Sequence, residues 1–445
     1  MRNRTWSRRS FLKGAAATGL ATAARKLPAA WAQGAPSAAG GHIIRLAMSQ
    51  SPWLAAFQQT ARAWEKHTGN KIEYRLFTFG GLLEKTLSAA QAKSQEFDLI
   101  QLHEIWCARF YAGGFVVSLN AIDPAFKWPA SLITYNNTGR WDLKARWFSP
   151  SGDIMALPIN GNLQLFYYRG DLYQEKGLKP PETWDDVVTS ARVLSDKPKG
   201  FYGYCNRGQK GFAALSWDFS AFLYGYGGSW FANLPTDWTQ TIDTDKALEA
   251  LEMYLNLAQF APPNVGNIGQ PEQFTLLESG KLLQTIVVSG GAFDMDDPNK
   301  STVVDKIQYT IVPKPIHGKH VSMLGIWLMG IPAAASKAQQ QVAFDFLKWF
   351  TSQDAQMQGA QLGGIPVRQD VYGSSLRTQK RFRYLKASGA STPYLGQYLD
   401  FDFAPEVIDV LELRLNQAVI GEAKPKQALQ AMQSEVARIV KAHGH

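Results

Sequence analysis

Apolar positions in the first hundred residues follow two periods that alternate. Residues 42–48 and 71–77 are short runs rich in branched and aromatic side chains, as in β-strands. Between them, apolar residues recur every three or four positions, which is typical of one helix face: Trp53, Phe57, Ala61 and Trp64. Residues 82–92 predict a second helix, and the mostly apolar run 97–102 predicts a strand covered on both faces. This alternation favours an α/β fold with a mainly parallel sheet.

Helix-start signals continue through the rest of the chain. Thr183 followed by Asp186 predicts an N-cap with a capping box, and Ser336 followed by Gln339 predicts a second one. Thr244 precedes a run with apolar residues at helical spacing, and Pro425 stands where the first residue of a last helix is expected. The sequence therefore predicts helices after each of these positions.

The segment 1–32 has the layout of a removable export signal. A basic start is followed by the weakly apolar run 14–24 and by Ala-Trp-Ala at 30–32, which suits a cleavage site. Residues 7–13, Ser-Arg-Arg-Ser-Phe-Leu-Lys, resemble the twin-arginine signal. We therefore expect the twin-arginine translocase as an export partner and a periplasmic location for the cleaved protein.

Removal of that segment changes the meaning of the chain's charge. The 445 residues have a formal net charge of +9, but seven of the 46 Lys and Arg residues lie within 1–32, which holds no Asp or Glu. The remaining chain has 37 acidic residues and a net charge of +2. Without a dense basic run, the sequence gives no indication of nucleic-acid binding.

The cysteines and histidines do not form a cofactor motif. Cys107 and Cys205 are the two cysteines, and their separation leaves open whether they pair or are both buried as small apolar residues. No CxxC or Cys/His cluster occurs, so we expect no metal, haem or other cofactor.

Three Pro- or Gly-marked segments join blocks of α/β pattern: 158–162, 311–315 and 363–366. If each of two lobes is built from two separate stretches of the chain, the chain must cross from one lobe to the other three times. Ordinary loops have the same composition, so this pattern alone does not decide between the two.

A series of blocks then resembles one protein family. The run 156–160, Ala-Leu-Pro-Ile-Asn, is followed by Leu-Phe-Tyr-Tyr-Arg at 165–169 and by a Gly-Leu, Pro-Pro, Thr-Trp helix start at 177–186. These resemble the extracellular solute-binding proteins of ABC importers, in the carbohydrate-binding group that includes maltose-binding protein. Arg169 departs from the Asn usual there. Further blocks agree in the same order: 98–103, 114–119, 274–281, 343–350, 363–368 and 421–429.

The resemblance implies a fold and a function. It implies a periplasmic-binding-protein-like α/β fold, with two α/β lobes joined by a multi-strand hinge around a ligand cleft. By analogy the first lobe takes 42–159 plus 314–364, and the second takes 160–313 plus 365–441. Such a protein is a monomer that captures a sugar, oligosaccharide or polyol by hinge closure and delivers it to the transmembrane subunits of an ABC permease, without catalysis.

A sugar site needs flat aromatic faces and converging hydrogen-bonding groups. Trp53 and the pair Glu104 and Trp106 follow predicted strands, where ligands of α/β sheets bind, although Trp53 also suits the helix core. We expect one of Trp217 and Trp230 to stack on the ligand and the other to lie in the core. By family position, Phe293 and Trp327 are further aromatic candidates.

The polar candidates lie at the expected crossings. Asn160 and Asn162 offer amides that donate and accept, although Asn also serves turns. Arg368 follows the third crossing, where a lone Arg is more often a surface charge.

Two other functions stay open. One is binding of another solute class, such as a phosphorylated polyol or a polyamine, which would need clustered cations or carboxylates. The other is an exported enzyme, for which the sequence has neither a dinucleotide fingerprint nor a G-x-S-x-G elbow.

Overall fold

The computed structural model describes residues 40–211 and 213–445. The predicted export signal at 1–32 lies outside the described residues. Among the described helices, none is both long and apolar enough to cross a membrane.

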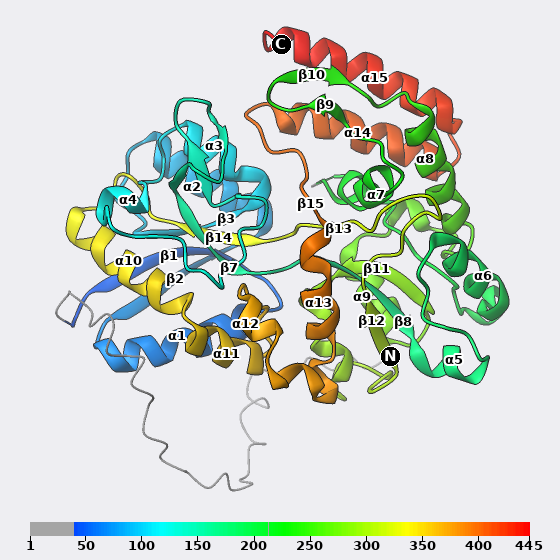
Figure 1. Cartoon of the computed structure of the whole chain (residues 1–445), viewed down its shortest axis with the longest axis horizontal. Helices are drawn as coiled ribbons and strands as arrows, with labels where there is room; N and C mark the ends of the chain where they lie inside the picture. Colours follow the sequence, from blue (N-terminus) through cyan, green and yellow to red (C-terminus); the bar gives the residue numbers. More distant parts are fainter. Residues whose placement is uncertain (1–39, 212) are drawn as a thin grey trace, which may run out of the picture. The chain divides into compact units, whose positions relative to one another are not determined.

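The first sheet has the strand order β2–β1–β3–β14–β7 (Figure 1). Its strands are β1 (Ile43–Ser49), β2 (Lys71–Phe77), β3 (Leu99–His103), β7 (Ala156–Asn160) and β14 (Trp327–Gly330). β1 is parallel to β2 and β3, whereas β14 is antiparallel to both β3 and β7. The helices α1 (Leu54–Thr68), α2 (Phe79–Gln91) and α10 (Lys337–Phe350) belong to the same part of the molecule.

The predicted apolar stripe of α1 is confirmed. Phe57, Ala61 and Trp64 are buried, and Trp53, also buried, stands at the N-cap position without a side-chain capping hydrogen bond. Gly69 ends α1 with φ at 76°, a left-handed conformation that glycine adopts without strain. The stripe fixes α1 against the sheet, so the loop between β1 and α1 has a defined position.

A second sheet has the order β11–β8–β12, and both of its pairings are antiparallel. Its strands are β8 (Gln164–Arg169), β11 (Gln284–Val288) and β12 (Ile307–Thr310). The expectation of a mainly parallel sheet is therefore wrong for this part. Here the chain returns to β8 in the opposite direction after a long helical excursion through α5 (Gly170–Glu175), α6 (Trp184–Leu194), α7 (Ala214–Gly225), α8 (Asp245–Ala258) and α9 (Gln270–Glu278).

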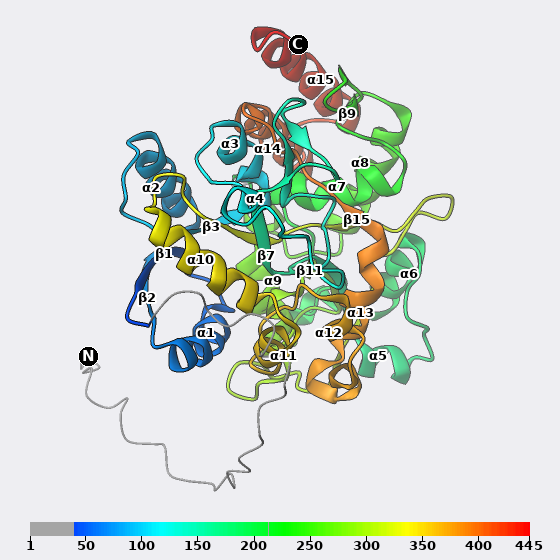
Figure 2. The same cartoon turned by 60° about the vertical axis from the view of Figure 1, so that its left-hand side comes forward.

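The helix caps follow the sequence closely. Thr183 and Asp186 form the expected capping box, and Thr244 caps α8. Ser336 accepts the N–H of Gln339, but the second half of that capping box is absent because the Gln339 amide donates to the carbonyl of Ile43 at 2.7 Å instead. The last helix, α15 (Pro425–Ala442), begins at Pro425 as expected and packs beside α14 (Ala404–Val419), which Figures 1 and 2 both show.

The described residues contain two hydrophobic cores. The first core takes residues from 44 to 159, from 324 to 350, and Val367. The second core takes residues from 163 to 323 and from 360 to 440. The chain thus changes cores after Ile159, again after Met323, and once more beyond Phe350. The exact lobe boundaries stay a prediction.

Short elements complete the described part of the chain. In the sheet β5–β4–β6, the strands are β4 (Arg140–Asp142), β5 (Trp147–Phe148) and β6 (Asp153–Ile154). β9 (Phe231–Asn233) pairs with β10 (Asp237–Gln240), and β13 (Ser322–Met323) with β15 (Leu395–Gly396). The remaining α-helices are α3 (Cys107–Ala112), α4 (Leu119–Ile122), α11 (Gln353–Gln361), α12 (Gln369–Tyr372) and α13 (Tyr384–Ser391). Cys107 and Cys205 are buried and unpaired.

Candidate functional site

A cavity of about 810 Å³ is lined by residues from both cores. From the first core come the ends of β1, β2 and β3, with residues 49–53, residues 78–81, Glu84, His103 and Ile105. These positions follow the carboxyl ends of parallel strands, where α/β proteins bind ligands. Trp327, on β14, also belongs to the first core. The facing wall includes Asn162, Arg207, Gln209, Trp217, Gln270, Phe274 and Gly290, and Gly325 lies at the crossing between the cores.

One wall of the cavity is aromatic. The Trp327 ring lies 6.4 Å from Trp53, 5.7 Å from Phe79 and 4.8 Å from His103, measured between ring centroids. The rings meet edge to face or tilted, so they hold one another in place. Burial lowers the pKa of His103 to about 3, and its imidazole is therefore neutral near pH 7. This wall offers rigid apolar faces without charge.

Trp106 supports this wall from behind. Its ring centroid lies 4.7 Å from Phe79 and 5.7 Å from Trp327, but the side chain is not among the residues that line the cavity. Its contacts fix the orientation of the two rings that do.

The opposite wall is more polar. The indole N–H of Trp217, on α7, donates to the carbonyl of Leu324 at 2.5 Å and so fixes the ring beside the crossing. The Arg207 guanidinium lies over this ring, 4.8 Å from its centroid. Gln209 and Gln270 add amides from the same side.

The two asparagines at the first crossing have different positions. Asn162 lines the cavity, and its Oδ1 accepts the backbone N–H of Gly290 at 2.9 Å and the Ser289 hydroxyl at 3.2 Å. Asn160 is buried outside the cavity wall, and its Oδ1 accepts the N–H of Asn162 at 3.1 Å. Asn160 therefore positions Asn162.

Glu104 is 1% exposed and does not line the cavity. Its Oε2 accepts the N–H of Ile326 at 2.6 Å, which ties the end of β3 to the start of β14. Burial raises the pKa of Glu104 to about 8, so its carboxyl group is mostly protonated near neutral pH.

The structure places three other sequence candidates away from the cavity. Trp230 is 1% exposed in the second core, and its indole N–H donates to the Ser220 hydroxyl. Phe293 packs beneath the Arg381 guanidinium at 3.8 Å. Arg368 pairs with Asp370 and donates to the carbonyl of Thr351.

Several residues of the cavity wall are not among the candidates predicted from the sequence. Thr78 and Phe79 follow β2, so the strand-end rule that selected Trp53 could have found them. Arg207, Gln209 and Gln270 lie in or beside loops of the second core, where no periodic or motif signal marks them. Among the described residues, no group of three or more His, Cys, Asp or Glu side chains is arranged to hold a metal ion.

Comparison with known proteins agrees with this geometry. Residues 49–357 match the family of bacterial extracellular solute-binding proteins. The chain belongs to this family. It is 24% identical over 432 residues to the mannitol-binding protein of Pseudomonas aeruginosa, covering 92% of this chain and 95% of that protein.

Two further proteins are similar to this chain over nearly their whole length. The probable amino-acid ABC transporter periplasmic-binding protein of Sinorhizobium fredii is 25% identical, covering 98% of this chain and 99% of that protein. The ribitol complex of an ABC transporter solute-binding protein from Agrobacterium radiobacter has a TM-score of 0.76 at 24% identity, covering 90% and 99% of the two chains. The shared fold is that of two α/β lobes.

Proposed function

We propose that this protein is the substrate-binding component of an ABC import system that captures a neutral sugar or polyol. The observation that carries the proposal is the cavity of about 810 Å³, with an aromatic wall on one side and amide and guanidinium groups on the other. A polyhydroxy ligand has C–H faces that suit aromatic rings and hydroxyls that suit fixed donors and acceptors.

Two of the similar proteins support this ligand class. One is named for mannitol, and the other is in complex with ribitol. Charge on the cavity wall supports it too. Glu84 and Arg207 contribute opposite charges, whereas a phosphorylated polyol would favour clustered cations and a polyamine clustered carboxylates.

Hinge closure is the proposed mechanism. The two lobes, 42–159 plus 314–364 and 160–313 plus 365–441, would close over a ligand that contacts both, because such a ligand has a higher affinity for the closed state. The closed monomer would then dock on the permease. We also propose export by the twin-arginine route, with cleavage near residue 32 and function in the periplasm.

A thermal-denaturation screen tests the ligand class. Ligands that bind only the folded protein stabilise it by about 2.7 kcal/mol at a concentration of 100 times Kd. We expect neutral compounds such as ribitol, D-mannitol or maltose to raise the melting temperature. A rise with sn-glycerol 3-phosphate, spermidine or an amino acid, and with no neutral sugar or polyol, would contradict the proposal. Turnover of a glycoside would support the exported-enzyme alternative.

A further inference from the structure

Arg207 is a buried cation on the wall of the cavity. The residue is 5% exposed, although it lines an open space of about 810 Å³. A guanidinium group at such a position must be held by the protein, because burial without partners is costly. Its contacts therefore indicate what remains free for a ligand.

Two glutamines hold the guanidinium group from one side. Its Nε–H donates to Gln273 Oε1 at 3.2 Å, and its Nη2–H donates to Gln270 Oε1 at 3.0 Å. Gln273 is itself fixed, since its Nε2 donates to the carbonyl of Cys205 and to the Thr285 hydroxyl, both at 2.9 Å. With the Trp217 ring below, the plane of the guanidinium group is set before any ligand arrives.

The charge of Arg207 is balanced within the protein. Asp218 Oδ1 lies 3.9 Å from the Arg207 Nε. The Asp218 carboxylate also accepts hydrogen bonds from Gln164 at 3.0 Å and Tyr254 at 3.0 Å, and it is fully buried. A balanced pair has less attraction for an anion than a free cation would have.

Nη1 makes no hydrogen bond to the described residues, and Nη2 uses one of its two N–H groups, so the end of the guanidinium group is free. A carboxylate binds best across two parallel N–H groups, yet the Nε and Nη2 side is already occupied by amides. A single hydroxyl oxygen needs one donor. With the Nε and Nη2 side occupied and the charge balanced by Asp218, the free end suits a neutral hydroxyl better than a carboxylate.

We propose that Arg207 is the residue that sets ligand specificity at this cavity, by donating from its guanidinium group to a ligand hydroxyl and favouring a neutral polyol or sugar over the corresponding sugar acid. This inference rests on the proposed function. The fixed plane above Trp217 makes the donor directional, so a lysine, which lacks the planar fork, should not replace it.

The test compares Arg207→Lys and Arg207→Met with the unaltered full-length mature protein. Calorimetric titrations would use two pairs of probes, ribitol with ribonate and D-mannitol with D-mannonate. The unaltered protein should bind at least one polyol at least about tenfold more tightly than its acid. Both variants should lose about 10- to 100-fold in polyol affinity, as expected when a charge-assisted hydrogen bond is removed. Arg169→Lys is the matched control, because Arg169 is also buried in the second core but pairs with Asp171 and does not line the cavity.

The titrations distinguish failure of the proposed function from failure of the proposed role of Arg207. If no sugar or polyol binds the unaltered protein, the proposed function fails. If a polyol binds but Arg207→Lys retains its affinity, or if the acid binds more tightly than the polyol, the specificity role of Arg207 is overturned while the function stands. Should Arg207→Met not fold, Gln270→Leu replaces it, because the variant frees Nη2 and should lower the ratio of polyol to acid affinity by several-fold. An unchanged ratio would also overturn the inference.

Discussion

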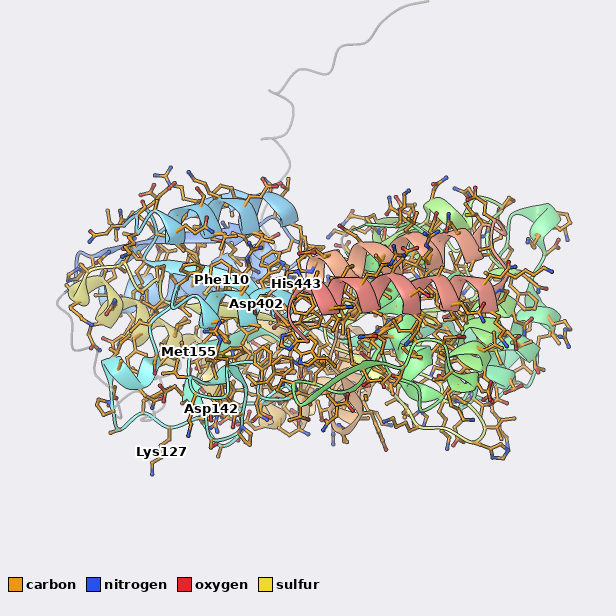
Figure 3. All side chains as sticks on the ribbon, turned by 90° about the horizontal axis from the view of Figure 1, so that it is seen from above. Phe110, Lys127, Asp142, Met155, Asp402 and His443 are labelled. Carbon is orange, nitrogen blue, oxygen red and sulfur yellow. The ribbon has the colours of Figure 1, made fainter. Side chains whose placement is uncertain are left out.

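The carboxyl group of Asp400 accepts the backbone N–H of Ala108, with its two oxygens 3.2 and 3.3 Å from the nitrogen. Ala108 belongs to α3 of the first core, and Asp400 belongs to the segment before α14, so this bond joins the two cores. Figure 3 labels Phe110 on the same helix and Asp402 in the same segment, and the two elements approach each other there. Asp400 is 4% exposed, and burial raises its pKa well above the usual value of 3.8.

Asp400 should make stability depend on pH. Its folded-state pKa is raised, so above about pH 4 the folded chain keeps a proton that the unfolded chain has lost, and stability falls as pH rises towards the folded-state pKa. Asp400→Asn keeps an oxygen acceptor for Ala108 but removes the titration. We expect a smaller pH dependence of the unfolding free energy between pH 4 and 8, measured by denaturant titration. A slope equal to that of the unaltered protein would contradict this role.

Glu104→Gln should be tolerated near neutral pH. The Glu104 pKa of about 8 means that the folded protein holds a neutral carboxyl group at pH 7, and glutamine has the same shape and is neutral. The proton is bound in the folded state between the ordinary pKa of 4.5 and about 8, so the glutamate's contribution to stability falls over that range as pH rises. Urea unfolding at pH 5 and pH 8 should show that Glu104→Gln reduces this fall. A large loss of stability at pH 5 in Glu104→Gln would show that the carboxyl group is ionised there.

Gly325→Ala should weaken ligand binding without harming the fold. A Cβ added at Gly325 would lie 3.5 Å from Asn162 Nδ2 and 3.6 Å from Trp217 Cζ2, which are ordinary contact distances. The methyl group would occupy the cavity wall between these two side chains. We expect about tenfold weaker binding by calorimetry and a melting temperature within a degree or two. Gly359→Ala is the control, because Gly359 does not line this cavity and its added Cβ would lie 3.4 Å from Thr60 Oγ1. This variant should leave the affinity unchanged.

Substitutions of Trp217 and Trp230 should have different effects, the first on ligand affinity and the second on stability. Trp217→Leu removes a ring from the cavity wall together with the support of Arg207, and should weaken binding by tenfold or more. Trp230→Phe leaves the wall intact but removes core volume and the hydrogen bond to Ser220, so it should lower stability by about 1–3 kcal/mol with affinity unchanged. Titration and thermal denaturation of both variants check this. Loss of affinity in Trp230→Phe alone would reverse the assignment.

Local patterns were sufficient to predict helices in both cores. The stripe from Phe57 to Trp64 predicted α1, and Thr183 with Asp186 predicted the start of α6, because both signals lie within a few residues of each other. The family blocks were sufficient for the two-lobe fold. The antiparallel second sheet was missed, because strand direction depends on pairings between residues more than a hundred positions apart, such as Leu165 with Val287.

Fewer of the residues that line the cavity could be predicted from the sequence. Trp53 was found because it follows a strand, but nothing local distinguishes Trp217 from Trp230, since both are tryptophans near α7 in an aromatic-rich stretch. Arg207 carries no motif, and its position depends on Gln270 and Gln273, which lie more than sixty residues away. Tertiary packing alone brings these groups together.

The most direct measurement is mass spectrometry of small molecules released when the natively purified protein is denatured. We expect a neutral sugar or polyol at up to one molecule per chain, with less released from Gly325→Ala prepared in the same way. A phosphate ester, a polyamine or an amino acid released at that stoichiometry would contradict it.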